Sequence, residues 1–158
     1  MEKKCSNQAE TEKLAAAIAS AAKAGDLFAL NGDLGAGKST FARAFIRALL
    51  DNPEAEVPSP TFTLVQLYDV PLCSVFHTDL YRIKDPDEVY DLGLDDERGD
   101  SILLVEWPDR MPAEWWDNAL VLSLKQPEGA PVGIDEARLV TFSGNEERWH
   151  QILKGGFL

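Results

Sequence analysis

The chain contains 158 residues, of which 45% are hydrophobic and 27% are charged, a composition that predicts one globular domain over residues 1–158 and excludes a disordered or fibrous protein. The formal net charge of −12 repels a phosphate backbone, so we expect no stable binding to nucleic acid by the chain alone. Two cysteines and two histidines are too few for a disulfide framework or a cysteine-rich zinc site.

The N-terminal residues 1–13 are charged and lack the apolar region of a secretory signal. Cys5 falls in this stretch, which we expect to be frayed. Every apolar run farther along is shorter than the ~20 residues that a membrane span requires. These features predict a cytoplasmic protein with no membrane-spanning segment.

Three elements are predicted in the first third of the chain. Residues 9–24 are alanine-rich, with Leu14 and Ile18 four positions apart, which predicts a helix that ends at Gly25. The short apolar run LFALN at 27–31 predicts a buried central strand. Residues 39–50 carry apolar side chains at helical spacing and predict an amphipathic helix.

The middle of the chain alternates predicted strands with one short helix. Residues 61–70 and 73–81 are rich in β-branched and aromatic side chains, which favours two strands. Residues 85–94 begin with Asp-Pro and predict a short helix. The strongly apolar run SILLVEW at 101–107 predicts a second buried strand beside the first.

The C-terminal third predicts a hairpin and a helix. Residues 118–125 and 137–143 alternate as paired strands around a loop at 126–135, and 145–155 predict a helix that packs Trp149, Ile152 and Leu153. Together the elements predict a three-layer α/β fold like that of P-loop NTPases, with a central mixed β-sheet flanked by helices. We expect the hairpin to extend one edge of this sheet.

Residues 32–40, GDLGAGKST, match the phosphate-loop pattern G-x-x-x-x-G-K-[ST] and lie between a predicted strand and a predicted helix. In such a loop, backbone N–H groups and the helix N-terminus bind phosphate oxygens. Lys38 is expected to reach the β- and γ-phosphates, and the Ser39 hydroxyl to bind Mg²⁺. The predicted nucleotide contacts here are Leu34, Gly35, Ala36, Gly37, Lys38, Ser39 and Thr40. Without an N-K-x-D guanine signature, ATP is the favoured nucleotide.

A phosphate loop also needs an acid at the end of a neighbouring strand to organise the metal or the attacking water. Glu106 follows the apolar run ILLV and is the stronger candidate, while Asp79 follows the less apolar run at 73–78. Trp107 beside Glu106 is interpreted as packing, although it could form a wall of the site. Lys38, Asp79 and Glu106 are therefore the predicted catalytic residues, with Ser39 and Glu106 as metal ligands.

Five segments taken in order resemble the TsaE family, the small P-loop ATPases of bacterial tRNA threonylcarbamoyladenosine biosynthesis. They are GDLGAGKST, SPTFTLV at 59–65, HTDLYR at 77–82, DPDEVYDLGL at 85–94 and VEWPDR at 105–110. The resemblance implies that Thr61 belongs to a switch segment near the γ-phosphate and that Thr11 lies near the nucleotide. It also implies that Asp79 is needed for activity and that Glu106 binds Mg²⁺.

The resemblance further implies a weak Mg²⁺-dependent ATPase that acts on a TsaD–TsaB complex and not on tRNA directly. No arginine finger is identifiable: Arg43 and Arg47 lie on the helix leading away from the loop, and Arg82 is a possibility that the sequence leaves open. We therefore expect slow hydrolysis alone and faster hydrolysis with the partners. The alternatives are a P-loop small-molecule kinase and a nucleotide-dependent binding module without significant turnover.

Overall fold

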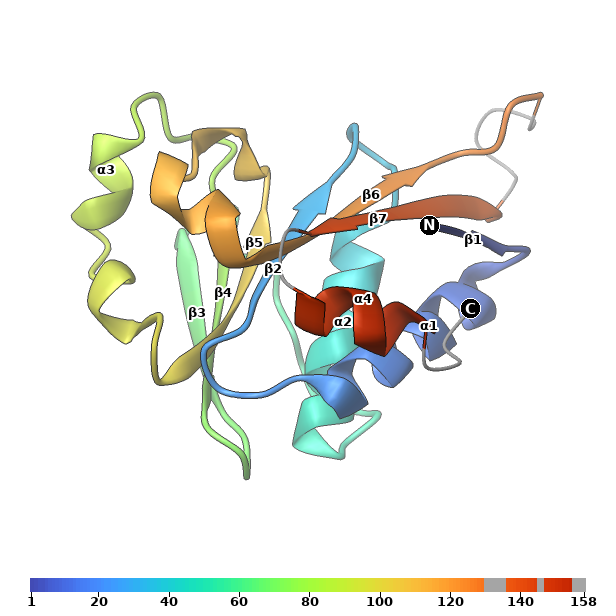
Figure 1. Ribbon diagram of the computed structural model, residues 1–158, viewed down its shortest axis with the longest axis horizontal. Coiled ribbons are helices and arrows are strands. Elements are labelled where there is room, and N and C mark those ends of the chain that lie inside the picture. The colour runs from blue at the N-terminus through green and yellow to red at the C-terminus, as the bar shows by residue number, and fades with distance from the viewer. Residues whose placement is uncertain (130–135, 145–146, 155–158) are drawn as a thin grey trace.

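The computed structural model describes residues 1–129, 136–144 and 147–154 (Figure 1). They form a seven-stranded sheet in the order β1-β7-β6-β2-β5-β4-β3. The strands are β1 (Glu2–Cys5), β2 (Leu27–Asn31), β3 (Val65–Asp69), β4 (Ser74–Asp79), β5 (Ser101–Glu106), β6 (Ala119–Lys125) and β7 (Arg138–Gly144). The helices are α1 (Gln8–Ala21), α2 (Lys38–Leu50), α3 (Asp87–Tyr90) and α4 (Glu147–Lys154), with 3₁₀ turns η1 (Asp95–Glu97), η2 (Pro108–Arg110) and η3 (Ala113–Asn118).

The sheet combines parallel and antiparallel pairs, as predicted. β2 pairs in parallel with β5 and β6, and β5 pairs in parallel with β4. β3, β7 and β1 are added antiparallel to their neighbours. The predicted α/β fold with a central mixed sheet flanked by helices is confirmed. This topology places the C-terminal ends of β2, β4 and β5 at one edge of the molecule, where the candidate site lies.

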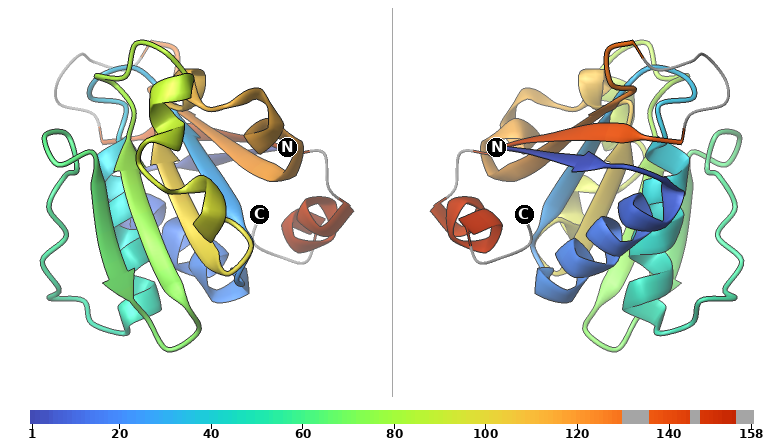
Figure 2. Two further views of the ribbon diagram at one scale, coloured as in Figure 1. Left: turned by 90° about the vertical axis from the view of Figure 1, so that its left-hand side faces the viewer. Right: turned by 90° about the vertical axis from the view of Figure 1, so that its right-hand side faces the viewer.

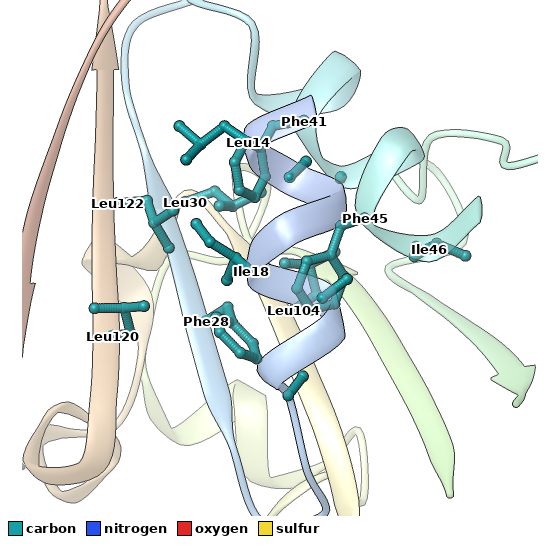
Figure 3. Close-up of a cluster of buried hydrophobic side chains, with 14 of the residues drawn as sticks. Leu14, Ile18, Phe28, Leu30, Phe41, Phe45, Ile46, Leu104, Leu120 and Leu122 are labelled. Atoms are coloured by element: carbon teal, nitrogen blue, oxygen red, sulfur yellow. The ribbon is translucent and has the colours of Figure 1, made fainter. Parts of the chain in front are cut away.

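Each face of the sheet is covered by its own apolar layer. Figures 1 and 2 show α1, α2 and α4 on one face, with α3 and the 3₁₀ turns on the other. On the first face, α2 presents Phe41 and Phe45 four residues apart, toward Phe28 of β2 (Figure 3). On the second face, Trp115 of η3 is fully buried. The apolar residues that recur at helical spacing in the sequence of α2 are therefore the residues that pack in the core.

Helix α1 ends at Ala21, earlier than predicted. Ala22 has extended backbone angles (φ −70°, ψ 148°), and the Lys23 N–H donates to the buried carboxylate of Asp26 at 2.8 Å. The Arg148 guanidinium pairs with Asp26 and also donates to the Ala21 carbonyl. Burial raises the pKa of Asp26, while the Lys23 N–H and Arg148 oppose that rise. The helix end is thus fixed by an arginine from α4, which no local pattern indicates.

The strand predicted at 61–70 begins only at Val65. Residues 60–64 form a turn in which the Leu64 N–H donates to the Pro60 carbonyl at 2.7 Å, and Leu64 has a positive φ of 67°. The Leu64 carbonyl then accepts the Thr78 hydroxyl at 2.6 Å. The turn carries residues 59–63 away from the sheet toward the phosphate loop.

The N-terminus is not frayed, and the hairpin does not form the edge of the sheet. β1 pairs antiparallel with β7, placing Cys5 opposite Arg138, and Cys5 is fully buried. β6 joins the sheet by pairing in parallel with β2. The hairpin therefore lies between β1 and β2, because β1 satisfies the free backbone groups of β7.

The remaining predictions from the C-terminal third are confirmed where they are described. β6 and β7 are antiparallel, and Trp149 and Leu153 of α4 are buried in the first core. Most of the predicted loop at 126–135, and the side chain of Ile152, lie outside the described residues. None of the described helices has the length and apolar character needed to cross a bilayer.

Phe28→Ala is expected to destabilise the fold by about 3–5 kcal/mol, because it removes a large buried side chain and leaves a cavity. The Phe28 ring lies 4.9 Å from that of Phe45 and 5.5 Å from that of Trp149. Urea unfolding followed by tryptophan fluorescence measures the loss. Phe62→Ala, at a side chain that is 84% exposed, is the matched control and should change stability by less than about 0.5 kcal/mol. Equal effects of the two changes would contradict the core described here.

Candidate functional site

The loop between β2 and α2 has the backbone of an anion-binding loop. Gly32, Gly35 and Gly37 all have positive φ. A Cβ on Gly32 would lie 2.7 Å from the Leu124 carbonyl oxygen, so only glycine fits there. Helix α2 follows at once, with no side-chain cap and no acid in its first turn. Its N-terminal N–H groups and its positive dipole end are therefore available to an anion.

Lys38 is the first residue of α2, and its side chain folds back over the loop. Its Nζ donates to the carbonyls of Gly32 at 2.5 Å and Asp33 at 2.9 Å. The same ammonium lies 4.1 Å from the ring centroid of Trp107. Burial lowers the pKa of Lys38, and the nearby carboxylates, led by Glu106, oppose that change. The cation is thus held at the mouth of the loop by the protein itself.

The two predicted acids end neighbouring strands and lie side by side. Asp79 of β4 is paired in register with Glu106 of β5, and both are buried. The Ser39 hydroxyl donates to Oε1 of Glu106 at 3.2 Å, while Nε2 of His77 lies 2.6 Å from Oε2. Ser39 and Glu106, predicted from the sequence as metal ligands, are therefore in direct contact.

Asp79 connects the strand end to the turn before β3. Its Oδ1 accepts the Tyr81 N–H at 2.9 Å, and its Oδ2 accepts the Thr61 hydroxyl at 3.3 Å. The hydroxyl oxygen of Ser59 lies 2.7 Å from that of Thr61. Burial raises the pKa of Asp79 and Glu106 adds to that rise, whereas the Tyr81 N–H opposes it. A displacement of Thr61 would therefore break a hydrogen bond that the Asp79 carboxylate accepts.

One cavity of about 290 Å³ brings nearly all of the predicted residues together. Its lining consists of Leu34, Gly35, Gly37, Lys38, Ser39, Thr40, Ser59, Thr61, Asp79, Glu106, Trp107 and Arg138. Two predicted residues lie just outside it. Ala36 lines an adjoining cavity of about 510 Å³, and Thr11 lines a small one of about 50 Å³ that shares Gly37, Thr40 and Arg138 with the main cavity.

The structure adds residues to the site that the sequence reading missed or interpreted otherwise. Arg138 of β7 donates to the carbonyls of Ala36 at 2.8 Å and Gly35 at 3.2 Å. Trp107 is a wall of the cavity and is held by Tyr81, whose ring lies 4.9 Å away. Arg82, which the sequence left open as an arginine finger, lies over the ring of Phe62 and is absent from the cavity lining. The sequence carries no local signal for Arg138, because only the pairing of β7 with β6 brings it to the loop.

The Ser39 hydroxyl and the Glu106 carboxylate form a donor set that suits Mg²⁺. The same set is too small for a metal ion whose ligands all come from the protein. In the described part of the chain, no three His, Cys, Asp or Glu side chains are grouped to bind an ion. Mg²⁺ commonly takes one or two protein oxygens and completes its shell with phosphates and water. One hydroxyl and one carboxylate beside a phosphate loop fit that pattern. A separate groove of about 330 Å³ along α1 and α2 contains none of Lys38, Asp79 and Glu106.

Comparison with known proteins gives concordant results. A family model described as "Threonylcarbamoyl adenosine biosynthesis protein TsaE" matches residues 5–131. Proteins named tRNA threonylcarbamoyladenosine biosynthesis protein TsaE are similar to the chain in Rickettsia felis (41% identity over 65% of this chain and 60% of that protein) and in Bacillus subtilis (35% over 92% and 87%). The match thus spans less than two thirds of the Rickettsia felis protein.

A solved structure is similar over nearly the whole length. The crystal structure of Bacillus subtilis YdiB aligns with a TM-score of 0.74 and 28% identity, covering 98% of this chain and 92% of that one.

Proposed function

The chain belongs to the TsaE family, and on that premise we propose that it binds and hydrolyses ATP with Mg²⁺ in support of tRNA threonylcarbamoyladenosine biosynthesis. The observation that carries the proposal is the convergence in one cavity of the glycine loop, Lys38, the Ser39–Glu106 pair and Asp79. A loop of this backbone directs N–H groups to phosphate oxygens. An acid contacting the Ser39 hydroxyl supplies the second oxygen that a phosphate-bound Mg²⁺ requires.

The groups of the chain divide the work of phosphoryl transfer to water. The loop amides and Lys38 would hold the phosphates and stabilise the negative charge that develops on them. Ser39 and Glu106 would hold Mg²⁺, which when bound neutralises charge on the phosphate oxygens. Asp79, whose pKa is raised by burial, would orient the attacking water or accept its proton.

Thr61 supports the interpretation of residues 59–63 as a switch. Its hydroxyl reaches Asp79 while Ser59 reaches Thr61, so the segment is linked to the acid and lines the same cavity. A ligand that bound Thr61 would change this link. We propose that the state of the nucleotide is transmitted to the surface through residues 59–63, where Phe62 is exposed.

A partner complex fits two features of the chain. These are its acidic net charge and a cavity whose described lining has Arg138 as its one arginine. The net charge of −12 suits contact with a basic partner better than direct contact with tRNA. Arg138 is the one arginine in the lining of the described cavity, and its described bonds to the loop are made to carbonyls. We propose that TsaD and TsaB are the partners and that their binding accelerates hydrolysis, as an added cation does for other P-loop enzymes.

Calorimetry with ATP and Mg²⁺ is expected to show one binding site, and phosphate release is expected to be slow for the protein alone. Adding TsaD and TsaB should raise the hydrolysis rate by about 10-fold or more, since a supplied arginine contributes as much as ~10³ to 10⁵ in other P-loop enzymes. ATP that fails to bind would overturn the nucleotide function. A rate unchanged by the partners would overturn their proposed role while leaving the nucleotide site intact.

The same assays separate the alternatives. A binding module without significant turnover would bind ATP and release no phosphate even with partners present. A small-molecule kinase usually closes an arginine-bearing lid over the phosphates. Here Arg98, in the acidic segment that includes η1, contacts Asp95 and Asn118 instead of the cavity. Transfer of phosphate to a metabolite in a substrate screen would nevertheless replace the hydrolase proposal.

A further inference from the structure

Both carboxylate oxygens of Glu106 are engaged by protein groups. The residue is 2% exposed, so water can serve few of its lone pairs. Oε1 accepts the Ser39 hydroxyl and Oε2 lies 2.6 Å from Nε2 of His77. Carboxylate oxygens are hydrogen-bond acceptors, so we assign the donor role in the 2.6 Å contact to Nε2–H of His77. His77 is therefore a donor to the acid that faces the phosphate loop.

Packing alone does not account for a histidine at this position. His77 lies in β4 opposite the apolar Leu104 of β5, and it shares a face of the strand with Val75, which is fully buried. Its other nitrogen, Nδ1, is buried and has no hydrogen-bond partner among the described residues. Such an atom costs folding free energy that an apolar side chain would avoid. The one described polar contact of the ring is directed at Glu106.

We propose that His77 is a positioning residue for the metal-binding acid, an inference that rests on the proposed Mg²⁺-nucleotide function. A glutamate side chain has three rotatable torsions, and the contact between Nε2 and Oε2 fixes the carboxylate so that Oε1 faces Ser39. Groups that orient a metal ligand in this way commonly contribute about 10- to 100-fold in metal affinity. His77 is thus a determinant of how strongly Mg²⁺ strengthens nucleotide binding.

The test compares the Kd of the non-hydrolysable ATP analogue AMP-PNP in EDTA with its Kd in Mg²⁺, by calorimetry. His77→Leu fills similar space without an N–H donor and is expected to lower this Mg²⁺ enhancement by about 10-fold or more. The Kd in EDTA should stay near the wild-type value, because the loop and Lys38 are untouched. His77→Gln keeps a side-chain N–H donor and should recover most of the enhancement.

Val75→Ala is the matched control, since it lies on the same face of β4 and has no bond to Glu106. It is expected to lower the thermal midpoint while leaving the Mg²⁺ enhancement at the wild-type value. An unchanged enhancement in His77→Leu overturns the positioning role, and so does a Gln variant that behaves like the Leu variant. A parallel loss of affinity in EDTA and in Mg²⁺ also overturns it by indicating a merely structural role.

The outcome for the wild-type protein separates this inference from the proposed function. Wild-type protein that binds no AMP-PNP, or binds it without Mg²⁺ enhancement, removes the premise and overturns both. Wild-type protein with a clear enhancement that His77→Leu retains overturns the role of His77 alone. His77→Gln is expected to keep a donor to Glu106, so a folded Gln variant that loses the enhancement overturns the inference even if the Leu variant does not fold.

Discussion

Lys38→Met is expected to raise the Kd for ATP in the presence of Mg²⁺ by about 10- to 100-fold. Hydrogen bonds to charged groups contribute about 1.5–3 kcal/mol each, and about 1.4 kcal/mol corresponds to a factor of ten in Kd. Lys38 would provide such bonds to the phosphates from the first turn of α2. The substitution removes this cation while the loop amides and the helix N-terminus remain, so weak binding should persist.

The size of the expected effect follows from how the lysine is held. Its ammonium is fixed by two loop carbonyls and by the Trp107 ring, so little side-chain freedom remains to be lost when a phosphate arrives. Methionine keeps an unbranched apolar side chain at this position and lacks the charge that lies over the Trp107 ring. Loss of affinity in this variant therefore reports the cation and not a collapsed cavity wall.

Calorimetry with ATP and Mg²⁺ measures the change, and Lys84→Met is the matched control. Lys84 is an exposed lysine outside the cavity lining, so its loss should leave the Kd near the wild-type value. Thermal unfolding verifies that both variants are folded. An equal Kd for Lys38→Met and wild type would show that the loop binds phosphate without its lysine, and the assignment of Lys38 would be wrong.

The parts of the fold that the sequence predicted well are those set by neighbouring residues. The apolar runs that became β2 and β5 have no alternation because both of their faces are covered. The start of α2 was predicted to within a residue. The glycines before it permit the positive φ of a loop, and the apolar residues after it recur at helical spacing. The strand-end acids followed from the same reasoning, since parallel strands deliver their C-terminal residues to one edge.

The parts that the sequence could not predict depend on contacts between distant segments. The sequence of β1 is that of a charged tail, and it forms a strand because its backbone pairs with β7. Arg138 stands 102 positions from the Ala36 carbonyl that it contacts, and the end of α1 depends on Arg148 of α4. The contact between His77 and Glu106 requires the register of β4 on β5. Single-sequence patterns report local periodicity and leave such pairings undetermined.

Glu106→Gln should reduce ATP hydrolysis by about 100-fold or more while leaving nucleotide binding in EDTA largely intact. Glutamine has the shape of glutamate. Its amide oxygen can accept from His77 while its NH₂ group donates to the Ser39 hydroxyl, so the hydrogen-bonded frame at the end of β5 is retained. It lacks the negative charge that a Mg²⁺ ligand provides. Metal stabilisation of the developing charge is worth several kcal/mol, and about 1.4 kcal/mol is tenfold in rate.

Binding and turnover should therefore separate in this variant. AMP-PNP titrations in EDTA should give a Kd close to that of wild type, and the strengthening by Mg²⁺ should be largely lost. Glu88→Gln, the same change at an exposed position on α3, is the control and should alter neither quantity. Equal losses of binding in EDTA and of hydrolysis would mean that Glu106 maintains the shape of the cavity. In that case Asp79, at the end of the adjacent strand β4, would become the acid to assign to the metal.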